Sequence, residues 1–137
     1  LIPISAPLTL DQSGIDKLKN QPMWLIHTKA DATVQPENSA LPLYKSLITS
    51  GATNKWFSYY ETATGTDLPG TEYDGHWAWI YFFHDQVIGV QHPENTKNWD
   101  GYSGMVATDP TNGGGSRASV NGQTYNSIFD WMSAQRH

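Results

Sequence analysis

Residues 22–27 read PMWLIH, a continuous apolar run of strand length with proline only at its first position. Proline has no backbone N–H, so it is tolerated at the start of a strand and not within it. A strand that is apolar on both faces is typical of a parallel sheet covered by helices on each side. This stretch therefore predicts an interior parallel strand and an α/β fold.

The flanking segments alternate between helix and strand patterns. Residues 1–10 predict an extended lead-in, residues 11–20 a short helix, and residues 38–50 a longer helix that Gly51 caps. Residues 55–61 read KWFSYYE, an aromatic-rich second strand, and residues 77–83 predict a short apolar helix. A last helix within 124–135 carries one apolar face: Tyr125, Ile128, Trp131 and Met132. The alternation favours a parallel α/β sheet, and two strands cannot form a core alone, so we expect the end of a larger sheet.

The length of 137 residues suits one domain, spanning 1–137. Residues 84–123 have no clear periodicity and contain the run NGGGS at 112–116. An irregular insertion of this length often carries function. We expect it to pack near the functional edge of the sheet or on the far side of the helix over 77–83, with Trp99, Tyr102 and Met105 as apolar anchors.

Composition excludes several classes of function. The net charge is −5 with only eight Lys and Arg residues, which argues against nucleic acid and anionic membranes as partners, and no apolar run is long enough to span a bilayer. Without cysteine there is no disulfide, thiolate metal site or Cys nucleophile. Low charge with many Thr, Ser, Asn, Gly and Trp residues predicts a secreted, bacterial-like protein whose signal peptide was removed or lies upstream.

Metal and cofactor sites are not expected. His84, His92 and His137 lack the regular spacing of zinc ligands. The acidic loop residues do not follow the EF-hand pattern of a calcium site: Asp67, Glu72, Asp74 and Asp100.

Two polar residues follow the two predicted strands. Asp31 lies four residues after the strand that ends at His27, and His76 lies 45 residues further on, directly before the apolar helix. Because functional groups gather at the carboxyl edge of a parallel sheet, we expect both side chains there. A carboxylate that accepts from one imidazole N–H fixes the ring tautomer, and the other nitrogen can then take a proton from a nucleophile. Each residue alone also has an ordinary interpretation, Asp31 as a turn former and His76 as a packed side chain.

The same segments resemble a known family. Residues 21–34 read QPMWLIHTKADATV and residues 73–79 read YDGHWAW, which resemble the triad-acid and triad-histidine segments of the α/β-hydrolases. The second segment is often Gly-His-Asp-x-Trp in that family, so Trp77 stands where a small or acidic residue is usual. The resemblance covers residues 21–83 and roughly 124–135. The pattern is most similar to secreted esterases of the polyhydroxyalkanoate depolymerase, feruloyl esterase and prolyl-oligopeptidase-like groups.

The resemblance implies that Asp31 is the triad acid and His76 the base, with His27 closing the strand and supporting the acid loop. In this family the nucleophilic serine precedes the acid, on a G-x-S-x-G elbow. No such motif occurs here: GGSRA at 114–118 comes nearest, but it ends in Ala118 and follows His76. We therefore expect the C-terminal portion of an α/β-hydrolase fold, a parallel sheet flanked by helices. The nucleophile and the oxyanion-hole amides would lie in an N-terminal half that this chain lacks.

The function implied is that of a serine hydrolase of carboxylic esters, whose partners are the ester substrate and that N-terminal half. A peptidase of the same fold is the nearer alternative, because the sequence does not separate ester from amide substrates. From composition alone, an acidic chain rich in Trp and Tyr could instead be a carbohydrate-binding module whose aromatic faces stack on sugar rings. Such modules are mostly β-sandwiches, so a nearly helix-free structure would favour that alternative.

Overall fold

The structure, a computed structural model, describes residues 1–64, 68–92, 102, 104–108 and 113–135. The helices are α1 (Gln12–Leu18), α2 (Ala40–Thr49), α3 (Trp79–Phe83) and α4 (Ile128–Ala134), with a 3₁₀ turn, η1, at Pro36–Asn38. The strands are β1 (Met23–Thr28), β2 (Lys55–Tyr60), β3 (Val90–Gln91), β4 (Gly115–Ser116), β5 (Ser119–Val120) and β6 (Gln123–Thr124). The order β1–α2–β2–α3 confirms the predicted alternation. None of these helices is long and apolar enough to cross a membrane.

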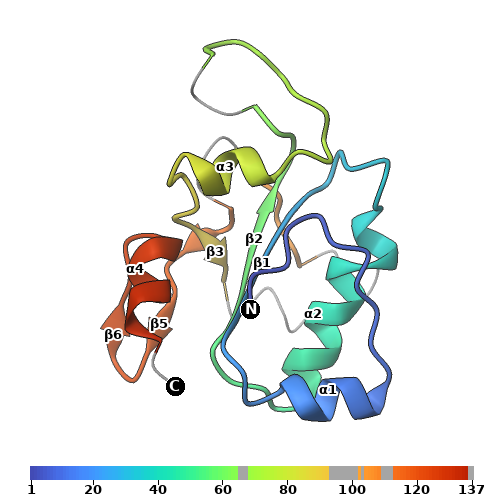
Figure 1. Ribbon diagram of the computed structural model, residues 1–137, viewed down its shortest axis with the longest axis vertical. Helices are drawn as coiled ribbons and strands as arrows, with labels where there is room; N and C mark the ends of the chain where they lie inside the picture. The colour runs from blue at the N-terminus through green and yellow to red at the C-terminus, as the bar shows by residue number, and fades with distance from the viewer. Residues whose placement is uncertain (65–67, 93–101, 103, 109–112, 136–137) are drawn as a thin grey trace.

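The centre of the fold is a parallel pair of strands. β1 and β2 pair residue for residue, from Met23 opposite Lys55 to Thr28 opposite Tyr60, and α2 connects them (Figure 1). Every residue of β1 is buried, as its unbroken apolar pattern predicts. The carboxyl ends of the two strands therefore lie next to each other, and the loops that follow them start from one edge.

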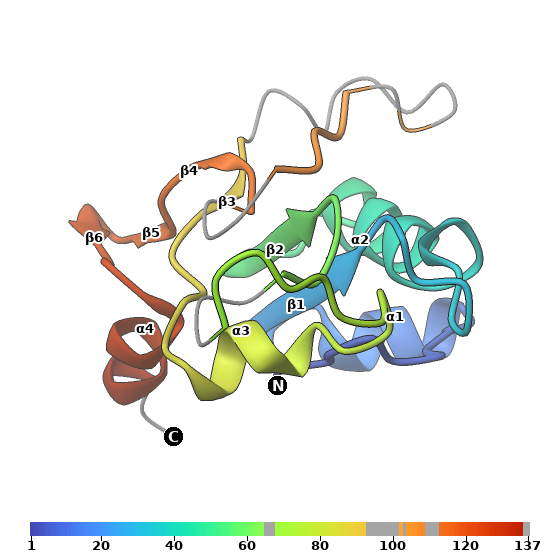
Figure 2. The same cartoon turned by 90° about the horizontal axis from the view of Figure 1, so that it is seen from above.

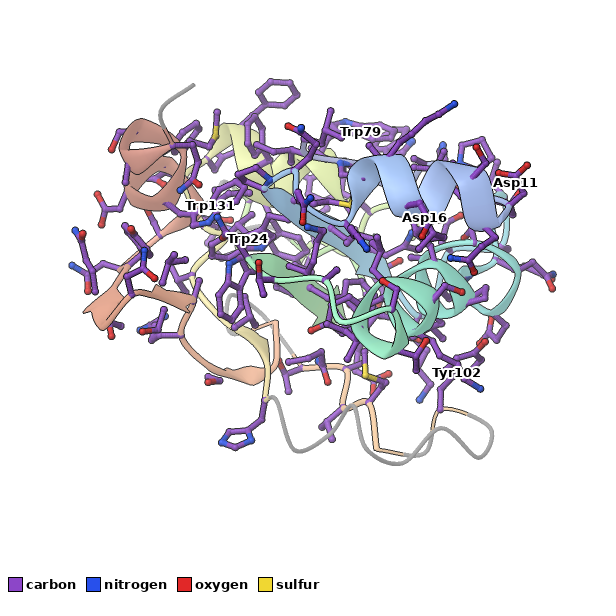
Figure 3. All side chains as sticks on the ribbon, turned by 90° about the horizontal axis from the view of Figure 1, so that it is seen from below. Asp11, Asp16, Trp24, Trp79, Tyr102 and Trp131 are labelled. Atoms are coloured by element: carbon purple, nitrogen blue, oxygen red, sulfur yellow. The ribbon has the colours of Figure 1, made fainter. Side chains whose placement is uncertain are left out.

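Helices cover both faces of this pair, as Figure 2 shows with α2 on one side and α3 on the other. Met23 and Leu25 face the α1–α2 side, where Phe57 of β2 joins the same core cluster. Trp24 and Ile26 face the α3–α4 side, where the ring of Trp24 meets that of Trp131 edge-on at 5.5 Å (Figure 3). The two-sided burial places the chain in the α/β class.

The second edge of β1 is covered by the extended lead-in. The lead-in runs parallel to β1, with Trp24 and Ile26 donating to the carbonyls of Leu1 and Pro3, and Ser5 donating back to Ile26. The open edge thus lies one segment further out. There, within the described residues, the backbone groups of Ile2 and Ile4 have no hydrogen-bond partner.

The insertion closes the other edge, along β2. The Tyr59 N–H donates to Gly113 at 2.8 Å, and the Thr108 N–H donates to the Tyr59 carbonyl at 3.1 Å. Gly113 has φ +52°, and a Cβ there would lie 2.5 Å from the carbonyl oxygen of Gly89. Close backbone packing therefore requires glycine at position 113.

α4 packs with a narrower apolar face than its sequence predicts. Ile128 and Trp131 are fully buried and Tyr125 is nearly so, but Met132 is 37% exposed. The predicted face therefore holds for three of its four residues.

A buried lysine ties the beginnings of the two strands together. The Lys55 ammonium donates to the carbonyls of Lys19, Gln21 and Thr53 at 2.9, 2.6 and 2.9 Å. All three N–H groups are thereby satisfied, and the turn from α1 into β1 is fixed against the start of β2. Burial lowers the pKa of Lys55 to about 8, because desolvation disfavours the charged ammonium.

Candidate active site

The loop after β1 is held against the end of β2. The N–H groups of Lys29 and Ala30 donate to the carbonyls of Tyr60 and Glu61, at 2.8 and 3.1 Å. These bonds continue the parallel pairing beyond the strands and bring Asp31 to the carboxyl edge of the sheet. This is the position that the spacing from His27 predicts.

Asp31 shapes its own loop. Its Oδ1 accepts from the backbone N–H groups of Thr33 and Val34, at 3.0 and 2.8 Å. The chain therefore turns around the carboxylate, in the way that Asp side chains commonly organise turns. The Asp31 side chain is fully buried, and its second oxygen, Oδ2, remains for other donors.

His76 is positioned by the residues just before it. Asp74 accepts from the His76 N–H through Oδ1 at 2.8 Å, and Thr28 of β1 donates to the Gly75 carbonyl. A Cβ on Gly75 would lie 2.3 Å from the carbonyl oxygen of Ala30, so only glycine permits this approach of the two loops. The Trp79 ring packs edge-on against the His76 imidazole at 5.5 Å.

The two loops bring Asp31 and His76 into contact, as predicted. Nδ1 of His76 lies 3.0 Å from Oδ2 of Asp31, and because a carboxylate can only accept, Nδ1 carries the proton. The other ring nitrogen, Nε2, has no hydrogen-bond partner among the described residues, and 27% of the side chain is exposed. The arrangement gives an imidazole whose tautomer is fixed by a buried carboxylate and whose second nitrogen can accept a proton.

His27 belongs to the same cluster. Its Nε2 lies 2.7 Å from the Val34 carbonyl oxygen and 3.2 Å from Oδ2 of Asp31. Burial is the largest influence on this ring and lowers the pKa of His27. The expected support of the acid loop by His27 is present as the bond to Val34. The contact with Asp31 was not predicted, because it depends on how tightly the loop turns back.

Comparison with known proteins finds similarity to solved structures over part of the chain. No protein-family model matches the chain, and neither does any curated protein. A crystal structure of a thermostable esterase matches at 28% identity with a TM-score of 0.49, over 62% of this chain and 21% of that one. The chain thus spans about a fifth of the length of that esterase.

The insertion reaches the same edge of the sheet in its described part. A pocket of about 370 Å³ lies between the ends of the strands and the insertion, with Lys29 and Glu61 on one wall and Met105 and Ala107 on the other. Met105 is also buried in the core cluster on the α2 side, where Tyr102 packs beside it (Figure 3). Packing near the carboxyl edge of the sheet is therefore confirmed for these residues. Trp99, the third expected anchor, lies outside the described residues.

The remaining candidates do not join the site. Ser116 lies in β4 opposite Val90, and no hydrogen bond links it to His76 in the described part of the chain. His84 and His92 are exposed. Among the described residues, no three His, Asp or Glu groups are arranged to hold a metal ion. Three further candidates fall outside those residues: Asp67, Asp100 and His137.

Proposed function

We propose that this chain supplies the acid and the base of a serine hydrolase that acts on carboxylic esters. The observation that carries the proposal is the hydrogen bond between Asp31 and His76, which leaves Nε2 of His76 without a partner among the described residues. The bond joins residues 45 positions apart, one in the loop after β1 and the other in the loop between β2 and α3. The resemblance of both segments to α/β-hydrolase triad segments supports the same roles.

In this mechanism Nε2 of His76 removes the proton of a serine hydroxyl as the serine oxygen attacks the ester carbonyl. Asp31 holds Nδ1–H and stabilises the imidazolium that forms. The imidazolium then protonates the departing alcohol, and an acyl-enzyme remains. Water, activated by the same nitrogen, hydrolyses the acyl-enzyme and regenerates the serine.

The nucleophile belongs to a separate stretch of polypeptide in this proposal. The sequence has no G-x-S-x-G elbow, and Ser116 is held in a two-residue antiparallel strand. The open backbone edge at Ile2 and Ile4 would accept a further parallel strand. A nucleophile-bearing half that adds such a strand would extend the sheet and bring its own carboxyl edge beside Asp31 and His76.

The alternative functions are less well supported. A peptidase would use the same acid and base, and the two are separated by assaying matched ester and amide substrates. A carbohydrate-binding module is disfavoured by the parallel pair joined by α2, because such modules are antiparallel β-sandwiches.

The test uses the complete enzyme, with the nucleophile-bearing half present. His76→Ala should abolish nearly all ester turnover, because no other group in the proposed mechanism takes the serine proton. Asp31→Asn should lower kcat by up to about 10⁴-fold through the wrong tautomer. His92→Ala, in an exposed histidine away from the cluster, is the control and should leave turnover within a few fold. Full activity in either His76→Ala or Asp31→Asn would refute the assigned role.

A further inference from the structure

The pocket between the insertion and the carboxyl edge of the sheet contains a polar group that the fold leaves unused. Tyr59 lines this pocket of about 370 Å³ and is only 4% exposed. Its hydroxyl has no hydrogen-bond partner among the described residues. The hydroxyl is also not one of the unpartnered oxygens that the described fold seals from solvent. A buried phenol that can both donate and accept therefore faces the pocket.

The walls around that hydroxyl carry more negative than positive charge. Glu37 and Glu61 both line the pocket, and Lys29 is the one cationic side chain among its described lining residues. Lys29 lies 3.4 Å from Glu61, but the two side chains are 58% and 47% exposed, so water weakens this pair. Glu37 has no ion pair in the described part of the chain. Burial, and after it the charges of Glu37 and Glu61, raise the pKa of Tyr59, so both carboxylates act on the hydroxyl.

This lining selects the charge of a ligand. The two carboxylates would repel an anion. An uncharged apolar group would strip water from Glu37 and from the Tyr59 hydroxyl without replacing the lost hydrogen bonds. An ammonium group offers three N–H donors, which match carboxylate oxygens and the phenol oxygen. Leu41 and Met105 add apolar walls that suit an alkyl stem.

A further strand on the open edge of the sheet would leave this pocket open. The open edge belongs to the lead-in, which lies on one side of β1, and β2 lies on the other side. The pocket is lined from the end of β2, from the segment before α2 and from the insertion. The occupant is therefore a molecule other than the added strand.

We propose that this pocket binds a primary alkylammonium group, with the ammonium against Tyr59 and Glu37 and the alkyl stem along Leu41 and Met105. Its volume of about 370 Å³ is that of a small-ligand site. A free amine and the lysine side chain of a polypeptide both present this group. The inference goes beyond the proposed hydrolase function, and the binding is measured without ester turnover.

The test is a titration of residues 1–137 with n-butylammonium, followed through the NMR shifts of the Lys29 and Ala107 backbone amides. A ligand of this size should saturate both shifts with a Kd on the order of 1 mM. 1-Butanol has the same length without the charge, and pentanoate carries the opposite charge. Each should bind about 10-fold more weakly or not at all, because neither replaces the charge-assisted hydrogen bonds. This comparison of ligands needs no substitution in the protein.

Two variants test the assigned contacts. Glu37→Gln and Tyr59→Phe should each raise the Kd for n-butylammonium by about 10-fold, the loss expected for one hydrogen bond to a charged group. Glu72→Gln removes the same charge from an exposed carboxylate outside the pocket lining and is the matched control. It should leave the Kd within about twofold, since salt screens exposed charges. Thermal unfolding of each variant controls for loss of the fold.

A blocked lysine, N-acetyl-lysine methylamide, separates the two sources of the ammonium group. A Kd below that of n-butylammonium would assign the pocket to a lysine side chain on a polypeptide, whose backbone adds contacts. An equal or higher Kd would assign it to a free amine. The proposal is overturned if n-butylammonium gives no saturable shifts in the folded chain, or if pentanoate binds as tightly. It is also overturned if Glu72→Gln weakens binding as much as Glu37→Gln.

Discussion

At the scale of single residues, the Asp31–His76 contact depends on the absence of a side chain at Gly75. A Cβ there would meet the Ala30 carbonyl carbon at 2.4 Å and the Asp31 nitrogen at 2.8 Å, and both are backbone atoms that cannot move independently. Gly75→Ala should therefore force the two loops apart, weaken the Asp31–His76 hydrogen bond and cost about 1–3 kcal/mol of unfolding free energy. The measurements are chemical denaturation and the proton NMR signal of His76 Nδ1–H, which the hydrogen bond to Asp31 shifts downfield.

Gly14→Ala is the matched control for that substitution. Its Cβ would meet the Leu10 side chain at 3.0 Å and Asp11 Oδ1 at an ordinary contact distance of 3.4 Å, both of them side-chain atoms and not backbone. Gly14 lies within α1, where alanine is favoured over glycine by up to about 1 kcal/mol. We expect Gly14→Ala to leave the unfolding free energy unchanged or to raise it, and to leave the His76 Nδ1–H proton NMR signal intact. If Gly75→Ala were as stable as Gly14→Ala and kept the Asp31–His76 hydrogen bond, the two loops would be able to move apart without breaking that bond.

Sequence reasoning identifies some residues of the site better than others. Asp31 and His76 are predictable, because strand ends fix where each loop starts and the residue types match the chemistry. The contact of His27 with Asp31 is not, because it requires the Val34 carbonyl to fold back over the end of β1. Gly75 gives no local signal either, since its partner is the peptide between Ala30 and Asp31, 45 positions away.

At the scale of elements, the edge of β2 depends on one glycine of the insertion. Gly113→Ala would place a Cβ 2.5 Å from the Gly89 carbonyl oxygen and 2.8 Å from the Ser58 Cβ. The Tyr59–Gly113 hydrogen bond should then open, and the Tyr59 amide should exchange with solvent faster in hydrogen-exchange measurements.

Gly115→Ala separates steric overlap from backbone strain in that test. Gly115 also has positive φ, +86°, but a Cβ there meets nothing within 4 Å. It should cost only the strain of the left-handed conformation and leave Tyr59 exchange unchanged. If the Tyr59 amide exchanged at the same rate in Gly113→Ala and Gly115→Ala, close packing at Gly113 would not be what holds the insertion on β2.

The elements themselves are predictable in proportion to their length. β1, β2 and α2 each have enough residues to show a period, and their predicted positions are confirmed. β3 to β6 have two residues each, which is too short for any periodicity. The lead-in reads as extended, but its pairing with β1 is a long-range contact that its own residues do not encode.

At the scale of the molecule, the chain alone should have no esterase activity. It lacks a G-x-S-x-G nucleophile and contains only the acid and base of the proposed triad. Residues 1–137 alone should not hydrolyse p-nitrophenyl esters or react with a fluorophosphonate. They should also self-associate, because the open edge at Ile2 and Ile4 offers unpaired backbone to a second chain. The assays are ester turnover and sedimentation against concentration.

A monomer with a sharp cooperative unfolding transition and genuine turnover would contradict this expectation. It would place the nucleophile within the 137 residues. Ser116→Ala would then be the first variant to examine, because Ser116 is the serine in the nearest approach to the elbow motif.

The Lys55 ammonium, buried among three carbonyl oxygens, makes unfolding of this chain a proton-consuming reaction in weakly alkaline solution. Between the folded pKa of about 8 and the ordinary value of 10.5, the unfolded chain carries a proton that the folded chain has released. Unfolding then takes up a proton, so this residue makes the fold more stable as pH rises, by at most about 1.4 kcal/mol per pH unit. At pH 9, the calorimetric enthalpy of unfolding should therefore depend on the ionisation enthalpy of the buffer, since the buffer supplies that proton. The dependence should fall sharply in Lys55→Met, and a buffer-independent enthalpy in the unsubstituted chain would mean that the ammonium keeps its proton within the fold.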